Sequence, residues 1–419
     1  MARPSALTPQ ALAGQLRPGQ RVYVPGSSGV PQVFLDALLS DPGYSAGLDI
    51  TTSLVPGINT FDASALAADA TVTGLFMQPA LQAAQRNGQY RALATSYAGF
   101  ERYLRQCAGF DYCVVQLSPP DHNGQCSLGP LGEFTPTAMS RSRAVVGVIN
   151  PHVPAIAGAV HVNLDQLSHV CHVDQPLAEY NVRSDAASAA IAGHVASLIG
   201  DGATVQMGLG GVPSALYPAL SNHRGLRLHS GMFSDGLIDL QASGALDPAF
   251  APTTCALVGS HAFYRQAANL PGLRVLGCHY THDPRTLLGL ERFTAVNSAL
   301  EVDLLGQCNL EHANGRAVSG VGGAPDFSRA ARLSTGGLSI VALNATYGRE
   351  AHSRIVAALP SGSITSLPRC DVDCVVTEYG IADLRGTSVH ERARALVDIA
   401  APQHRDALAL AWETIAARL

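Results

Sequence analysis

The sequence predicts an α/β protein made of two similar, open, mostly parallel α/β domains. Three observations predict this class. Short apolar runs typical of buried strands alternate with helical patterns along the chain. A unit of strand, glycine-rich turn and helix occurs twice. The length of 419 residues exceeds what one core usually holds, at about 150 residues per domain.

The apolar runs are continuous rather than alternating, which is typical of parallel strands buried on both faces. We expect strands at 112–117, 144–149, 338–343 and 374–377. Helices are expected at 185–199 and 388–400.

The repeated unit begins with Val22-Tyr23-Val24 in its first copy and with 204–207 in its second. A turn follows each run, Gly26-Ser-Ser-Gly29-Val30-Pro31 and Gly208-Leu-Gly-Gly-Val-Pro213. Both prolines are expected in the first turn of the following helix, where a missing N–H costs little. The repeat predicts an N-terminal domain at 1–182 and a C-terminal domain at 183–419.

The composition is 47% hydrophobic and 14% charged, against about 25% charged residues in an average chain. This predicts a large core and an oligomer interface, although a large monomer with a neutral surface also fits. The net charge is −5, and there is no basic cluster, which argues against nucleic acid as a partner.

Lysine is absent, so all 27 basic residues are arginine. This excludes a Walker A loop, a pyridoxal-phosphate Schiff base and a protein kinase. No Gly-x-Ser-x-Gly elbow is present, which argues against an α/β-hydrolase. No Gly-x-Gly-x-x-Gly fingerprint with a following acidic residue stands out, so a nicotinamide enzyme is not favoured.

The nine cysteines show no disulfide framework, which is typical of a reducing compartment. The start of the chain lacks a signal-peptide pattern, and no run of 18 apolar residues occurs. These observations predict a cytoplasmic protein without a membrane partner. The histidines and cysteines at 169–172 and 278–282 fit no standard zinc spacing, so no metal is expected.

Two kinds of residue are candidates for chemistry. The glycine-rich turns at 208–213 and 319–323 can offer backbone N–H groups to a phosphate or an oxyanion, or can simply be tight turns. Acidic residues in apolar surroundings can act as nucleophile or general base, or can pair with arginine. They are Asp235, Glu301, Glu311 and Glu378.

Several long, ordered motifs occur along the chain. They are Gln116-Leu-Ser-Pro-Pro-Asp121-His-Asn-Gly124-Gln-Cys-Ser-Leu-Gly129, Gly208 to Pro213, His229-Ser-Gly-Met-Phe-Ser-Asp-Gly236, Asn297-Ser-Ala-Leu-Glu-Val-Asp303, Ser319-Gly-Val-Gly-Gly-Ala-Pro-Asp-Phe327 and Val376-Thr-Glu-Tyr-Gly-Ile-Ala-Asp-Leu-Arg-Gly386. In their order and spacing these motifs resemble the acetyl-CoA hydrolase/transferase family of the CoA-transferase superfamily, whose members include 4-hydroxybutyrate, butyrate–acetate and itaconate CoA-transferases. The resemblance covers nearly the whole chain.

The resemblance implies an acyl-CoA-dependent enzyme with its active site in the cleft between the two domains. The CoA thioester is implied as substrate, with a small carboxylate or other acyl acceptor, no permanently bound cofactor, and a homodimer or larger oligomer. Asn297 matches a polar contact near the thioester. The loop 129–133 is expected to face the acyl end. The residues implied in CoA binding are Gly208, Leu209, Gly210, Gly211, Val212, Gly320, Val321, Gly322 and Gly323.

The sequence departs from the family at one position. Most of these transferases have His-Ser/Thr-Glu-Met-Phe-Ser-Asp, in which the glutamate attacks the acyl-CoA and then carries CoA as a glutamyl thioester. This chain has Gly231 at that position, while His229 and Asp235 remain. Glycine has no side chain and cannot form this intermediate.

Three interpretations stay open. The chain can be a CoA-transferase that takes its carboxylate from elsewhere or works through a ternary complex. It can be a hydrolase or direct acyltransferase, with His229 or Asp235 as general base. It can also be a CoA-binding protein without catalysis. Glu378 is expected to brace the fold, with replacement of the missing nucleophile as the alternative.

Overall fold

The computed structural model describes residues 4–419, which form two compact units. Unit 1 comprises the described residues up to Asn181 together with Ala251–Asp283, and unit 2 comprises Val182–Phe250 and Pro284–Leu419. The sequence-based division at 182/183 falls one residue from the change of unit at Asn181. That division assigns 251–283 to the second domain, whereas these residues group with unit 1.

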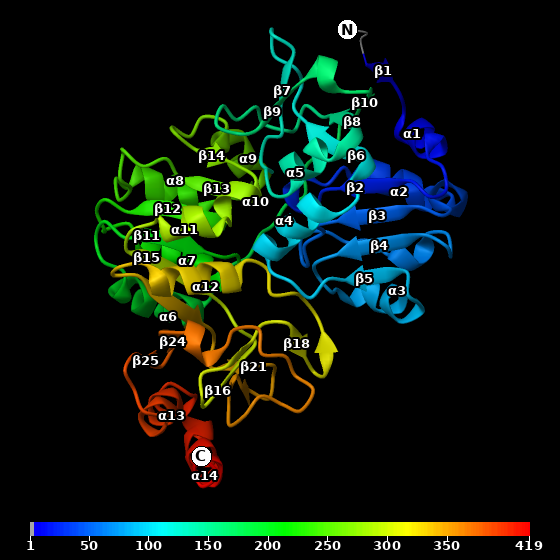
Figure 1. The fold of residues 1–419 in the computed structure, drawn as a ribbon. Coiled ribbons are helices and arrows are strands. Elements are labelled where there is room, and N and C mark those ends of the chain that lie inside the picture. Colours follow the sequence, from blue (N-terminus) through cyan, green and yellow to red (C-terminus); the bar gives the residue numbers. More distant parts are fainter. Residues whose placement is uncertain (1–3) are drawn as a thin grey trace. The chain divides into compact units, whose positions relative to one another are not determined.

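Unit 1 is built on an eight-stranded sheet in the order β1-β10-β8-β6-β2-β3-β4-β5, and all neighbouring strands pair in parallel (Figure 1). The strands are β1 Ser5–Ala6, β2 Arg21–Val24, β3 Asp49–Thr52, β4 Thr71–Gly74, β5 Tyr90–Ala92, β6 Phe110–Leu117, β8 Ser142–Ile149 and β10 His169–His172.

The helices of unit 1 are α1 Pro9–Gln15, α2 Gln32–Ser40, α3 Gln82–Asn87, α4 Tyr97–Gln106, α5 Thr135–Ser140, α9 His261–Ala267 and α10 Cys278–Thr281. Two further strands, β13 Thr253–Leu257 and β14 Arg274–Val275, pair in parallel. The short strands β7 Gln125–Ser127 and β9 His161–Asn163 pair antiparallel.

Unit 2 contains the parallel neighbours β12, β11, β15, β20 and β24, followed by an antiparallel edge strand, β25. The strands are β11 Thr204–Met207, β12 Arg227–Phe233, β15 Phe293–Asn297, β20 Leu338–Ala342, β24 Cys374–Thr377 and β25 Gly380–Asp383. Strands β11, β20 and β24 are buried throughout, as their continuous apolar sequences predict.

The helices of unit 2 are α6 Ala186–Leu198, α7 Gly211–Ala219, α8 Gly236–Ala242, α11 Pro284–Leu288, α12 Ala324–Leu333, α13 Val389–Asp398 and α14 Pro402–Ala416. Helix α13 packs against β25, and α14 packs against α13 at the C-terminal end of the chain (Figure 1). The small strands are β16 Glu301–Asp303, β17 Cys308–Asn309, β18 His312–Ala313, β19 Arg316–Ala317, β21 Thr346–Tyr347, β22 His352–Ser353 and β23 Ile355–Val356.

The helix boundaries follow from capping residues in the sequence. Asp185 accepts the N–H of Ser188 at 2.8 Å and begins α6. Ser388 and Glu391 form a capping box that begins α13. Such caps satisfy N–H groups that have no acceptor within the helix, so the helices expected at 185–199 and 388–400 are confirmed.

The predicted repeat is also confirmed. Strand β2 leads through a glycine-rich turn into α2, and β11 leads through Gly208–Gly210 into α7. The prolines differ in their places, since Pro213 is the third residue of α7 whereas Pro31 lies just before α2. The α/β class with large parallel sheets is thus as the sequence predicts. Among the described residues, no helix is long and apolar enough to cross a membrane.

Candidate functional site

The carboxyl ends of three adjacent strands in unit 2 gather the residues that the sequence analysis singled out. Strand β11 pairs with β12 through Val205 and Leu228, and with β15 through Met207 and Val296. Continuing these two registers places Gly231, Gly208 and Asn297 at one level. Because strands are about 4.8 Å apart, Gly231 and Asn297 flank Gly208 at a separation of about 10 Å.

The order of these strands explains why a ligand site forms here. From β11 the chain continues to β12 on one side, and later returns to β15 on the other side of β11. The strand order therefore reverses at β11. In open parallel sheets, ligands bind beyond the carboxyl ends of the strands at such a reversal, because the outgoing loops diverge there.

The loop after β11 presents backbone N–H groups at this edge. Gly210 has φ +127°, which a residue with a side chain rarely adopts, and it directly precedes α7. No side chain caps α7. Since the first N–H groups of a helix have no acceptor within it, they are oriented to bind an anionic or carbonyl oxygen at this end.

A second glycine-rich loop, 320–323, begins α12. Helix α12 packs against β15 and β20 and, like α7, has no side-chain cap. The amide Nδ2 of Asn297 donates to Ser328 Oγ on this helix at 3.2 Å. Asn297 is therefore held at the same end of the sheet where α12 starts.

Strand β12 carries His229 and Gly231 on one face, because side chains two residues apart in a strand point the same way. His229 is buried, with 2% of its surface exposed, while Asp235 is exposed just before α8. Ser230 Oγ donates to the carbonyl oxygen of Met207 at 2.6 Å, which fixes β12 beside β11. The strand thus brings a buried imidazole and a position without a side chain to the site.

The turn after β12 is held by Tyr217, whose hydroxyl accepts the N–H of Ser234 at 3.3 Å. Burial raises the pKa of the Tyr217 hydroxyl to about 12, so this group stays neutral. Gly236 lies against the same ring, and a Cβ there would stand 2.5 Å from Tyr217 Cγ.

We expect Gly236→Ala to lower the free energy of unfolding by about 1–3 kcal/mol, because the buried ring must shift to admit the methyl group. Denaturant unfolding measures the change. The matched control is Gly193→Ala in α6, where no atom lies within 4 Å of the added Cβ, and we expect it to stabilise by up to about 1 kcal/mol. Equal free energies of unfolding for the two variants would contradict the predicted clash between the added Cβ and the Tyr217 ring.

The other acidic candidates have structural partners. Glu301 Oε2 accepts Asn309 Nδ2 at 3.0 Å, and Glu311 Oε2 accepts Ser366 Oγ at 2.7 Å. Glu378 Oε2 accepts the N–H of Ala345 at 2.8 Å, which ties the loop after β20 to the end of β24. This hydrogen bond is the kind of contact expected of a residue that braces the fold, while the alternative of a replacement nucleophile stays untested.

Unit 1 buries a carboxyl group that the sequence did not single out as unusual. Glu133 has no exposed surface and adopts φ +42°. Its carboxylate accepts Ser53 Oγ at 2.8 Å and Tyr97 Oη at 2.9 Å. Burial raises the pKa of Glu133 to about 7, although these two hydrogen bonds act to lower the pKa. That the loop 129–133 faces the acyl group stays a prediction.

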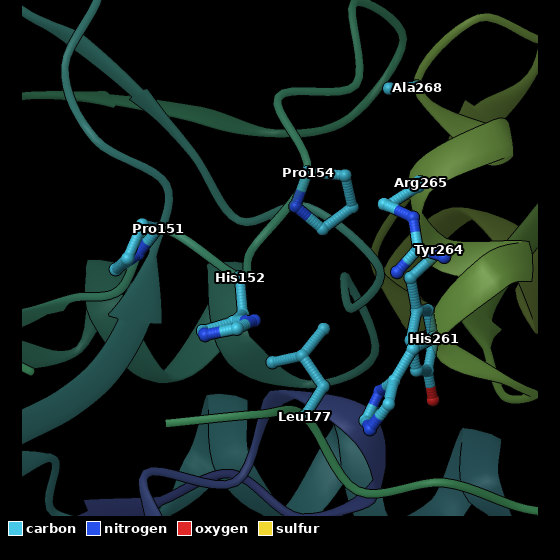
Figure 2. Close-up of a pocket in the computed structure, with 8 residues that line it drawn as sticks. All are labelled: Pro151, His152, Pro154, Leu177, His261, Tyr264, Arg265 and Ala268. Carbon is cyan, nitrogen blue, oxygen red and sulfur yellow. The ribbon is translucent and has the colours of Figure 1, made fainter. Parts of the chain in front are cut away.

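Unit 1 also contains a cavity of about 290 Å³ between the loop after β8 and α9 (Figure 2). Its nitrogen-bearing side chains are His152, His261 and Arg265. His152 Nε2 lies 2.8 Å from Asp174 Oδ1. The rest of the lining is Pro151, Pro154, Leu177, Tyr264 and Ala268.

Comparison with known proteins shows the family to which the chain belongs. The model of the acetyl-CoA hydrolase/transferase C-terminal domain matches residues 259–411. The 4-hydroxybutyrate coenzyme A transferase of Clostridium kluyveri is 30% identical over 413 residues, covering 96% of each chain. The chain belongs to the acetyl-CoA hydrolase/transferase family. This membership rests on the match with that relative, which extends over nearly the full length of both chains.

Solved structures extend the likeness to three dimensions. The 4-hydroxybutyrate CoA-transferase of Porphyromonas gingivalis superposes with a TM-score of 0.79 at 30% identity, covering 99% of this chain and 98% of that one. RipA from Yersinia pestis shares the fold, with a TM-score of 0.89 at 24% identity, covering 98% and 97%. This family member therefore has the CoA-transferase type of fold that the sequence predicts.

The sequence alone did not predict the roles of two residues at this site. Ser328 holds Asn297, and Tyr217 holds the turn that follows Gly231. Ser328 lies nine residues after the recognised motif begins at Ser319, inside a helical pattern, but its partner across the sheet is not readable from one sequence. Tyr217 stands in the helix after the first glycine turn, where an aromatic residue ordinarily indicates core packing.

Proposed function

We propose that this protein is a CoA-transferase that moves CoA between a short-chain acyl-CoA and a small carboxylate. Its relatives named CoA-transferases match almost the full length at about 30% identity. The observation that carries the proposal within the chain is the edge formed by Gly208, Asn297 and Gly231 at the start of two uncapped helices. It supports binding of a phosphate-bearing thioester there.

The roles of the residues follow from their places. Residues 208–212 and 320–323 supply N–H groups for CoA, and Asn297 supplies an amide for the thioester carbonyl. A donor aimed at a developing oxyanion contributes about 2.7–4 kcal/mol to the barrier reduction. The chemistry uses the CoA thioester itself and no permanently bound cofactor. The protein is proposed to work as a homodimer or larger oligomer in the cytoplasm.

Because Gly231 has no side chain that could attack the thioester, the proposed reaction uses the acceptor carboxylate as the nucleophile. The acceptor carboxylate attacks the thioester carbonyl directly, the C–S bond breaks, and CoA leaves as the thiolate while a mixed anhydride forms. The thiolate then attacks the acceptor's carbonyl carbon in that anhydride and releases the donor acid. Atoms and charge balance without a covalent bond to the protein, because both substrates are held together in a ternary complex.

Gly231 itself favours a second candidate, hydrolysis of the acyl-CoA. Water can occupy the space that a glutamate would fill. His229 on β12 and Asp235 before α8 are the proposed general bases, since both lie on the segment around Gly231. The products are then free CoA and the carboxylic acid.

One assay separates these candidates. The purified protein is incubated with a panel of acyl-CoAs, with and without acetate or other carboxylates, and thioesters and intact protein are followed by mass spectrometry. We expect a new acyl-CoA that forms only with the carboxylate, and no covalent protein adduct. Free CoA without an acceptor would identify a hydrolase. No turnover with any pair would contradict both activities.

We expect Gly210→Ala to raise the KM for acyl-CoA by on the order of tenfold. The loop must keep φ +127° at this position to present its N–H groups, and alanine disfavours that conformation. Steady-state kinetics measures the change. The matched control is Gly19→Ala in unit 1. Gly19 also has positive φ, and no atom lies within 4 Å of a Cβ added there. Both variants should lose about 1 kcal/mol of stability, and an equal KM for both would contradict the role of Gly210.

A further inference from the structure

Two cysteines and one histidine converge in the interior of unit 1. Cys255 lies in β13, Cys278 is the first residue of α10, and His282 directly follows that helix. Their sulfur and imidazole nitrogen atoms all lie within 4.8 Å of one another. Each of the three residues has at most 1% of its surface exposed.

The local fold explains this convergence. Cys278 and His282 are four residues apart on a helical turn, so their side chains lie on one face, and the N–H of His282 donates to the carbonyl of Cys278 at 3.0 Å. Glu133 ties the two segments together. Its N–H lies 3.1 Å from the carbonyl of Cys255, and its carbonyl accepts the N–H of Cys278 at 2.6 Å. The three side chains are therefore held in place by backbone hydrogen bonds.

We propose that Cys255, Cys278 and His282 bind one divalent metal ion of the zinc class. Thiolate and imidazole are the ligands that zinc prefers, and soft thiolates disfavour calcium and magnesium. Binding breaks two S–H bonds, forms two metal–sulfur bonds and releases two protons to solvent. Two thiolates and one divalent cation make a neutral group, so the complex avoids the cost of burying a net charge.

Neighbouring groups hold the ring of His282 in place. Its Nδ1 lies 3.0 Å from Thr281 Oγ1. The ring of Tyr97 packs against it with centroids 4.8 Å apart. Such contacts restrict the orientation of a ligating histidine.

The three ligand atoms lie close enough together for one tetrahedral ion to contact all of them. Three protein ligands leave the fourth position of such an ion to water.

The test measures metal rather than turnover. The full-length protein, expressed with added zinc, is dialysed and analysed by inductively coupled plasma mass spectrometry, and cobalt replaces zinc in a second sample. We expect one equivalent of metal, with sulfur-to-cobalt charge-transfer absorption. Cys255→Ser and His282→Asn should lose both signals. Circular dichroism and the unfolding midpoint establish that each variant is folded.

The matched control is Cys113→Ser, since Cys113 is equally buried in unit 1 but lies outside the cluster. We expect it to keep the metal and the cobalt spectrum. Three results would overturn the proposal. They are folded wild-type protein without metal, the same metal content in Cys255→Ser as in wild type, or a mass loss of two hydrogens that shows a Cys255–Cys278 disulfide instead.

Discussion

Replacing Gly231 with glutamate is expected to give the protein a covalent intermediate that glycine at this position cannot form. Position 231 lies in β12, at the level of Gly208 and Asn297. A carboxylate there would attack the thioester held at the same edge. We expect Gly231→Glu to accumulate a protein–CoA thioester, which intact mass spectrometry detects as an added CoA mass.

The transferase rate of Gly231→Glu should rise by on the order of 10²-fold or more, because a positioned nucleophile replaces an encounter between two bound substrates. The matched control is Gly231→Gln, which has nearly the same size but no carboxylate. It should form no thioester and gain no rate. If the two variants behave alike, position 231 does not face the thioester, and the proposed use of this edge fails.

The second large effect is expected at Gly26, in the first copy of the repeated turn. A Cβ at this residue would lie 2.2 Å from the carbonyl oxygen of Ser53 and 2.4 Å from its carbonyl carbon. These are backbone atoms of the loop after β3, so they cannot move without shifting the sheet. We expect Gly26→Ala to cost about 3 kcal/mol of unfolding free energy, measured by denaturant titration.

Gly29 provides the comparison within the same turn. A Cβ there would meet Leu131 Cδ2 at 2.4 Å and Leu131 Cβ at 2.8 Å, which are side-chain and not carbonyl atoms. We expect Gly29→Ala to cost about 1–2 kcal/mol, less than Gly26→Ala, because the clash involves one side chain that can shift and no backbone carbonyl group. A loss for Gly26→Ala no larger than that for Gly29→Ala would show that the loop after β3 yields more easily than its packing indicates.

Much of the site could be predicted from the sequence because its parts are local. The glycine turns at 208–211 and 320–323 are visible in the sequence as clusters of glycine, of which Gly210 and Gly322 adopt positive φ, and helices follow them directly. Continuous apolar runs identified the buried parallel strands. Asn297 was recognised because it stands in a motif that resembles the family.

Other features depend on contacts between segments far apart in the chain, which one sequence does not encode visibly. The hydrogen bond from Asn297 to Ser328 joins β15 to α12, and the strand order that brings Gly231 beside Gly208 depends on β12 pairing with β11. The grouping of residues 251–283 with unit 1 likewise depends on contacts between segments far apart in the chain.

The sequence by itself determined the α/β class, the repeated strand–turn–helix unit and the chemistry excluded by the absence of lysine, because each depends on residue type and short-range spacing. Only the tertiary structure decided that Cys255 meets Cys278 and His282, and that Glu133 is buried between Ser53 and Tyr97. The physical reason is that burial and proximity arise when strands and helices pack against one another. How far apart two such elements lie along the chain does not determine how far apart they lie in the folded protein.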